Sequence, residues 1–192
     1  MAYSSGFNPH PRISYAGASA TGAATEADYL ELGLAERREP AWLIGALTAA
    51  LPDGIDVLDA VEWTPGGPDG RSLSERLGAS RWRADLPEAS RAALTDAVPA
   101  LLDADEAWVE RLTKNGVRRF DARGAILELV PDGAALTMVL VQGSPLVRPD
   151  DVVLALAQVA HLASEAQPGG SVLFTRLQQG DWRDGELADP LR

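Results

Sequence analysis

The chain has 192 residues, a formal net charge of −11 and no cysteine. This acidic balance argues against a protein that binds nucleic acid over its whole surface, because phosphate neutralisation needs lysine and arginine. The lack of thiols excludes disulfides, thiolate metal sites and a cysteine nucleophile from this chain. With two distant histidines, we expect no metal and no cofactor. No apolar run approaches the roughly 18 residues that cross a bilayer, so we expect a cytoplasmic protein without a membrane partner.

The first third of the chain contains extended and helical patterns in turn. An extended segment at residues 12–17 precedes residues 27–34, where apolar and polar residues alternate as in a strand with one buried face. A helix is predicted at residues 41–51, directly after Pro40, and a further strand at residues 55–63.

The strongest break in the chain is the run Thr-Pro-Gly-Gly-Pro-Asp-Gly at residues 64–70. Ser72 and Glu75 follow it with the spacing of a capping box, which predicts a short helix. We therefore divide the chain into a first unit at residues 1–66, a linker with a short helix at 67–79, a second unit at 80–179 and a loose polar tail at 180–192.

The second unit has a longer series of elements. Strands are predicted at residues 80–86, 108–113, 126–130, 135–141 and 171–177, and helices at 90–103 and 149–163. This order matches a split βαβ, ferredoxin-like unit with an added strand, and the first unit matches the same pattern without its opening strand and helix. The predicted fold class is therefore α+β, with two tandem ferredoxin-like units of which the first is incomplete.

An incomplete first unit has a consequence for its partners. A three-stranded sheet covered by one helix leaves half of one face exposed, so a second copy in a homodimer, another chain or a preceding segment is expected to cover it. Three tryptophans, Trp42, Trp82 and Trp108, are predicted to lie in the core.

The first candidate site is the proline-rich loop near the N-terminus. Pro9 and Pro11 stiffen the backbone, so Asn8, His10 and Arg12 are expected to project from a built loop and to contact an anion or a nucleobase. The alternative is a loop that packs across the sheet and satisfies buried backbone groups. His10 is a poor general base unless a partner orients it.

The second candidate site is a basic cluster within an acidic protein, presented by a turn at Lys114. A local basic patch with an aromatic residue can hold phosphate and stack a base. The alternatives are a contact with a partner protein, or an exposed turn whose charges pair with nearby carboxylates. The cluster comprises Arg111, Lys114, Arg118, Arg119, Phe120 and Arg123.

Two stretches of this sequence resemble the radical-SAM-linked protein family of unknown function. They are Ser5-Gly6-Phe7-Asn8-Pro9-His10-Pro11-Arg12-Ile13-Ser14 and Glu26-Ala27-Asp28-Tyr29-Leu30-Glu31-Leu32, and the similarity continues through Leu51-Pro52-Asp53-Gly54-Ile55 to the segment ending at Lys114. Such proteins occur as stand-alone chains in high-GC Gram-positive bacteria and as the C-terminal part of larger radical SAM proteins. They usually begin with roughly forty further residues, a strand and a basic helix, which matches the elements missing from the first unit.

The resemblance implies a functional link to a radical SAM enzyme, and genes of this family often lie near those of ribonuclease E/G and ribosomal proteins. We therefore expect a non-catalytic accessory protein that binds RNA or a ribonucleoprotein in RNA modification or processing, a step that rests on analogy of fold. The alternative is a protein–protein adaptor that docks on the radical SAM partner without nucleic-acid contact. A third possibility is an RNA-processing enzyme that uses His10.

Overall fold

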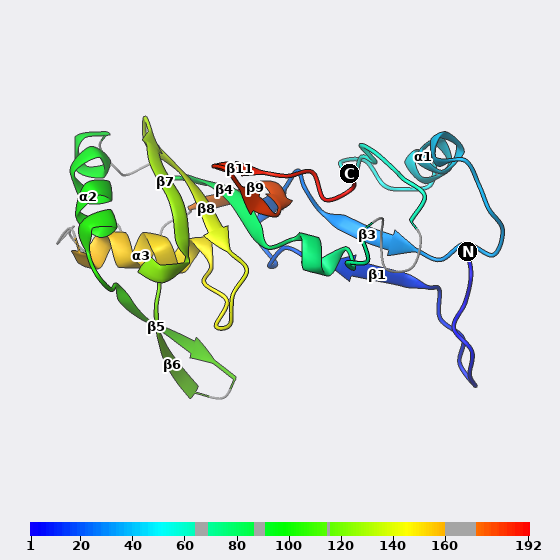
Figure 1. The fold of residues 1–192 in the computed structure, drawn as a ribbon, viewed down its shortest axis with the longest axis horizontal. Helices are drawn as coiled ribbons and strands as arrows, with labels where there is room; N and C mark the ends of the chain where they lie inside the picture. Colours follow the sequence, from blue (N-terminus) through cyan, green and yellow to red (C-terminus); the bar gives the residue numbers. More distant parts are fainter. Residues whose placement is uncertain (64–68, 87–90, 115, 160–171) are drawn as a thin grey trace. The chain divides into compact units, whose positions relative to one another are not determined.

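The computed structural model describes residues 1–63, 69–86, 91–114, 116–159 and 172–192 of a mixed α+β chain. The chain divides into two compact units (Figure 1). Unit 1 comprises Met1–Ala18, Asp28–Arg76 and Leu191–Arg192, and unit 2 comprises Ser19–Ala27 and Leu77–Pro190. Within the described ranges, no helix has the length and apolar character to cross a membrane. The breaker residues 64–68 and the end of the helix predicted at 149–163 lie outside these ranges.

Unit 1 contains a two-stranded sheet and short helices. Strand β1 (Ile13–Ala16) pairs antiparallel with β3 (Tyr29–Leu32), and α1 (Pro40–Thr48) begins with the predicted proline in its first turn. The 3₁₀ helix η1 (Ser74–Arg76) follows the predicted capping box, in which the Ser72 backbone N–H and hydroxyl both donate to the Glu75 carboxylate at 2.7 and 2.6 Å.

Unit 1 buries few apolar side chains. Among its described residues, the buried hydrophobic side chains are Ala16 and Leu73, and α1 buries none. The prediction of Trp42 as a core residue is therefore wrong, because its side chain lies 57% exposed. Residues 55–63 also form no strand, since their alternating pattern finds no strand edge to pair with.

Unit 2 is built on a five-stranded sheet in the order β2–β9–β4–β8–β7. Strand β4 pairs antiparallel with β8 and β9, β7 pairs antiparallel with β8, and the short β2 pairs parallel with β9. Helix α2 follows β4 in the chain, and α3 connects β8 to β9. The bounds are β2 (Ala24–Thr25), β4 (Ala79–Asp85), α2 (Arg91–Asp103), β7 (Ile126–Asp132), β8 (Ala135–Val141), α3 (Pro149–Val159) and β9 (Leu173–Gly180).

The core of unit 2 lies between one face of this sheet and the two helices. Trp82 and Ala84 on β4 point into it because side chains on a strand alternate between faces, and the prediction of Trp82 as a core residue is confirmed. Leu94 and Leu101 from α2 and Leu156 from α3 join the same cluster, so both helices cover the same face of the sheet.

The segment Ser19–Ala27 belongs to unit 2 in the structure. The sequence pattern instead predicts that all of residues 1–66, including a strand that begins at Ala27, form the first unit. β2 lies at the edge of the sheet beside β9, where the Glu26 N–H donates to the Arg176 carbonyl at 2.8 Å. The buried Gln179 amide donates to the Ala27 carbonyl at 2.6 Å. These bonds hold the segment against β9.

The C-terminal tail, whose polar composition predicts a loose segment, contains a short antiparallel strand pair. Strand β10 (Trp182–Arg183) pairs with β11 (Glu186–Leu187), and Leu187 packs with Ala79 and Val139 on the sheet face opposite the helices. Apolar residues in this short tail therefore cover part of that face, which polar composition alone does not reveal.

Gly180 lets the tail approach the sheet closely. A Cβ atom at this position would overlap the backbone of Ala188, which lies directly against it. We expect Gly180→Ala to displace the tail and to lower the free energy of unfolding by about 1–3 kcal/mol, the usual cost of overpacking. Urea denaturation measures this loss, and limited proteolysis of the tail reports its release. Gly185→Ala, whose Cβ meets open space, controls for removing a glycine, although its φ of +86° adds some strain of its own. Unchanged stability and proteolysis of Gly180→Ala would contradict the packing role.

Candidate functional site

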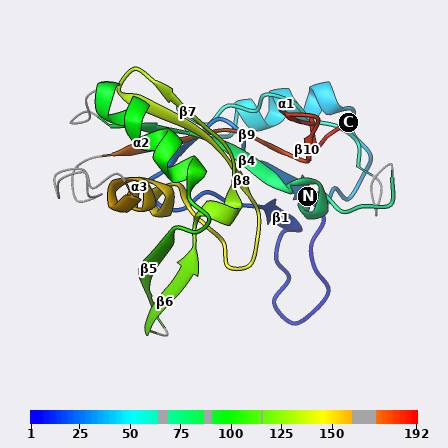
Figure 2. The same ribbon diagram turned by 60° about the vertical axis from the view of Figure 1, so that its left-hand side comes forward.

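A β-hairpin projects from unit 2. Strand β5 (Trp108–Thr113) pairs antiparallel with β6 (Gly116–Asp121), and both views show the hairpin extending away from the sheet and the helices of this unit (Figures 1 and 2). Gly116 has a φ of +106°, a conformation that a glycine adopts at little cost. The basic cluster predicted from the sequence lies on and next to this hairpin.

One face of the hairpin fastens it to the core. Val109 and Phe120 are cross-strand partners and both are buried, so Phe120 is not available to stack a base. The Arg111 guanidinium lies 4.8 Å from the centre of the Phe120 ring. It donates to the Asp151 carboxylate at 2.7 Å and to the Leu146 carbonyl at 3.0 Å. Arg111 therefore connects the hairpin to α3.

Arg123 also has a structural position. It lies in the 3₁₀ helix η2 (Arg123–Ala125), and its Nε and Nη2 atoms donate to the Leu102 carbonyl at 3.1 and 2.9 Å. Leu102 stands in the last turn of α2, where carbonyl groups lack partners within the helix. Arg123 satisfies one of these groups, and the structure thus separates Arg111, Phe120 and Arg123 from the exposed cations of the cluster.

The opposite face and the tip of the hairpin are exposed to solvent. Lys114 at the turn and Arg119 on this opposite face are exposed, and Arg118, which lies near the tip on the same face as Arg111, is exposed as well. The Arg119 guanidinium lies 4.8 Å from the centre of the Trp108 ring, and the indole N–H donates to the Glu106 carboxylate at 2.7 Å.

Trp108 is the site residue that the sequence prediction missed. It was expected in the core but is 44% exposed, because its neighbour Val109 takes the inward position on β5. The inward partner of Val109 on β6 is Phe120. Both faces of residues 108–113 contain apolar residues, so the alternation in this segment alone does not show which face is buried.

Asp151 is the buried acid of this region. It lies in the first turn of α3 and accepts the Arg148 backbone N–H at 2.8 Å, in addition to its bond from Arg111. Burial raises the pKa of Asp151, and the Arg148 N–H and the Arg111 charge offset only part of this effect. Arg111 thus compensates a carboxylate that would otherwise be costly to ionise.

The proline-rich loop forms an exposed arm of unit 1. The Ser4 backbone N–H donates to the His10 carbonyl at 2.8 Å, the His10 N–H donates to the Ser4 hydroxyl at 3.0 Å, and Tyr3 bridges to Pro11. The side chains of Asn8, His10 and Arg12 are all exposed.

Gly33 fixes the base of this arm. The Gly33 N–H donates to the Arg12 carbonyl at 2.8 Å, and a Cβ on Gly33 would lie 2.8 Å from the Arg12 Cβ. Backbone hydrogen bonds join the two sides of the arm to each other and to Gly33, the residue after β3. Because the side chains of Asn8, His10 and Arg12 are exposed, they are not partners of buried backbone groups.

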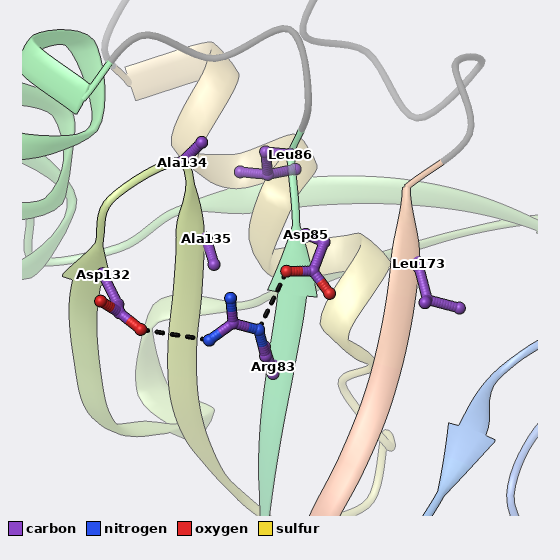
Figure 3. A pocket seen from close by; sticks show the side chains of 7 residues that line it. All are labelled: Arg83, Asp85, Leu86, Asp132, Ala134, Ala135 and Leu173. Atoms are coloured by element: carbon purple, nitrogen blue, oxygen red, sulfur yellow. Dashed lines mark hydrogen bonds and ion pairs between the residues drawn. The ribbon is translucent and has the colours of Figure 1, made fainter.

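A shallow hollow of about 300 Å³ lies on the sheet face opposite the helices. Figure 3 shows the Arg83 guanidinium between two carboxylates, at 2.9 Å from Asp85 and 3.1 Å from Asp132. Because both acids pair with the one arginine, the hollow offers no excess positive charge to an anion. Within the described residues, no group of three or more acids and histidines is placed to hold a metal ion.

The two units and the projecting hairpin define a mixed α+β protein with exposed arms. The chain belongs to the family described as an uncharacterized protein conserved in bacteria, DUF2344, whose model matches residues 1–149. No curated protein and no solved structure matches the chain.

Proposed function

We propose that the protein is a non-catalytic accessory protein that binds RNA or a ribonucleoprotein through the β5–β6 hairpin. The observation that supports this function is the exposure of Lys114, Arg118 and Arg119 on one projecting element. Within the described part of the chain, none of the three forms an ion pair. Their charges are therefore available to phosphate groups.

The charge distribution limits where RNA binds. Phosphate contacts supply most of the affinity of a protein for nucleic acid, and a chain with a net charge of −11 repels the backbone over much of its surface. A hairpin that extends from the unit brings three cations to the RNA while the acidic surface stays farther away. Such an arm is more suitable for a protein that contacts RNA at one place and positions it than for a protein that encloses the RNA.

The fold of unit 2 is consistent with this function. We interpret the order β9–β4–β8–β7, with α2 between β4 and β7 and α3 between β8 and β9, as a ferredoxin-like unit with the hairpin inserted after α2. We interpret unit 1 as a second unit of the same kind that is less complete than the sequence pattern predicts, because residues 55–63 add no third strand to its β1–β3 sheet. Tandem units of this fold often bind RNA, which supports the proposal by analogy alone.

The link to a radical SAM enzyme rests on the resemblance of the N-terminal loop and the strand after it. In this proposal the enzyme supplies the chemistry and the present chain supplies the RNA contact. His10 is not assigned a catalytic role, because no hydrogen bond that would orient its ring is found among the described residues.

Replacing the three exposed cations tests the proposal. We expect K114A/R118A/R119A to weaken binding of cellular RNA in a mobility-shift assay and to reduce the slope of log affinity against log salt by about 1.4–2.7 units, which corresponds to two or three lost phosphate contacts at about 0.7–0.9 each. A matched control is R37A/R38A/R183A, which removes the same charge from exposed arginines outside the hairpin. Equal binding by both triple variants, or no shift with the unmodified protein, would contradict the proposal.

One observation favours a second candidate, an adaptor that docks on the radical SAM partner. The pairs Ile13–Leu32 and Tyr15–Leu30 share one face of the β1–β3 sheet, and Ile13, Tyr15 and Leu30 are all exposed. A sheet face with three apolar side chains in solvent, beside the half-buried Leu32, is typical of a surface that another protein covers. The adaptor is the function that is left if RNA does not bind.

A further inference from the structure

Trp108 is a surface tryptophan whose ring is held in one orientation and is covered by an arginine on one side, while much of the residue stays in solvent. The indole N–H is held by Glu106 at 2.7 Å and the ring lies beneath the Arg119 guanidinium at 4.8 Å, yet 44% of the residue stays exposed. Neither contact belongs to the core of unit 2. The residue thus presents a fixed aromatic surface at the base of the hairpin.

From this geometry we infer that the hairpin selects unpaired nucleotides, one of whose bases stacks on Trp108. The inference rests on the proposed RNA-binding function and names the form of RNA that is bound. A base offers its flat face to an aromatic ring only when it is released from a duplex, whereas phosphates are equally accessible in both forms. An exposed, oriented tryptophan is therefore useful to a protein that binds single strands.

The charges around Trp108 indicate how such a strand lies. Glu106 binds the indole, and Glu110 occupies the same hairpin face opposite Arg119. These carboxylates repel phosphate but tolerate an uncharged base. Arg118 projects from the other face and Lys114 lies at the turn. The bases therefore face Trp108, and the phosphates pass the tip and the Arg118 side.

Fluorescence anisotropy tests the inference by measuring the affinity of the protein for two labelled probes of equal length. One probe is a single-stranded oligoadenylate and the other is an RNA duplex. We expect the unmodified protein to prefer the single strand. Trp108→Leu is expected to reduce its affinity for oligoadenylate by about 5- to 140-fold, the range of one base–aromatic stack, without changing the salt dependence. Trp108→Phe, which retains a ring, should recover most of the loss, and duplex binding should be the same in all variants.

Trp42→Leu is the matched control, because Trp42 is also exposed and also lies beneath an arginine, with Arg38 at 5.3 Å. It should bind both probes as the unmodified protein does. Duplex binding as tight as single-strand binding, or unchanged oligoadenylate binding by Trp108→Leu, would overturn the inference while leaving RNA binding intact. Failure of the unmodified protein to bind either probe would overturn both the inference and the proposed function.

Discussion

Arg111→Met is expected to lower the free energy of unfolding by about 2–4 kcal/mol at neutral pH, because it leaves a buried carboxylate without its cation. The Asp151 side chain is 4% exposed and that of Arg111 is 18% exposed, so water replaces the guanidinium poorly. Methionine keeps much of the apolar contact with Phe120, so the loss reflects mainly the missing charge. Chemical denaturation followed by circular dichroism measures the change.

The pH dependence of this loss identifies its cause. A carboxyl group whose pKa is raised on folding binds protons more tightly in the folded state, so it reduces stability as the pH rises from its unfolded value, about 3.9, through its folded pKa. Burial already raises the pKa of Asp151, and removing Arg111 raises it further. The cost of Arg111→Met should therefore be largest at pH 7 and shrink towards pH 4.

The double variant R111M/D151N is the control for this prediction. Asparagine retains an oxygen that accepts the Arg148 backbone N–H, but it has no charge that needs compensation. It should recover most of the stability lost in Arg111→Met. A cost that is equal at pH 4 and pH 7, or that Asp151→Asn does not relieve, would mean that Arg111 acts through packing and its bond to Leu146 alone.

The four long strands and the two helices that form the core of unit 2 could be predicted from the sequence because each of them has a buried face. Trp82 and Ala84 are two positions apart on a strand, and Leu94 and Leu101 are seven positions apart on a helix. Both spacings place the side chains in the same core, and this is why the sequence shows both patterns. In unit 1 the same kind of pattern misleads at residues 55–63, where alternation is present but no neighbouring strand supplies hydrogen bonds. Periodicity predicts a strand only where the fold provides a partner for its edges.

The candidate site was predictable as a location but not in its details. The concentration of arginine near Lys114 indicates the hairpin, whereas the roles of individual residues depend on distant partners. Arg111 binds Asp151, forty positions further along the chain, and Arg123 binds the Leu102 carbonyl, twenty-one positions before it. No local pattern contains these contacts, so the sequence could not separate structural arginines from exposed ones.

The uneven burial of the two units leads us to expect that they have different roles. Unit 2 has a continuous core that can hold a projecting hairpin in place, and unit 1 exposes an apolar sheet face and a backbone-closed arm. Stability and RNA contact are thus expected to depend on unit 2, whereas a protein partner is expected to meet unit 1. Substitutions in the two units should then separate these properties.

Leu101→Ala is expected to destabilise the protein by about 3 kcal/mol, whereas Leu47→Ala should cost less than about 1 kcal/mol. Leu101 is fully buried between α2 and the sheet, so truncation leaves a cavity among side chains that cannot close over it. Leu47 lies on α1, which buries none of its residues, so the same truncation leaves no enclosed cavity. Urea denaturation of both variants measures the difference. Comparable losses of unfolding free energy in the two variants would contradict the prediction. They would show that unit 1 has a core of its own in solution, as when its apolar sheet face is covered by another chain.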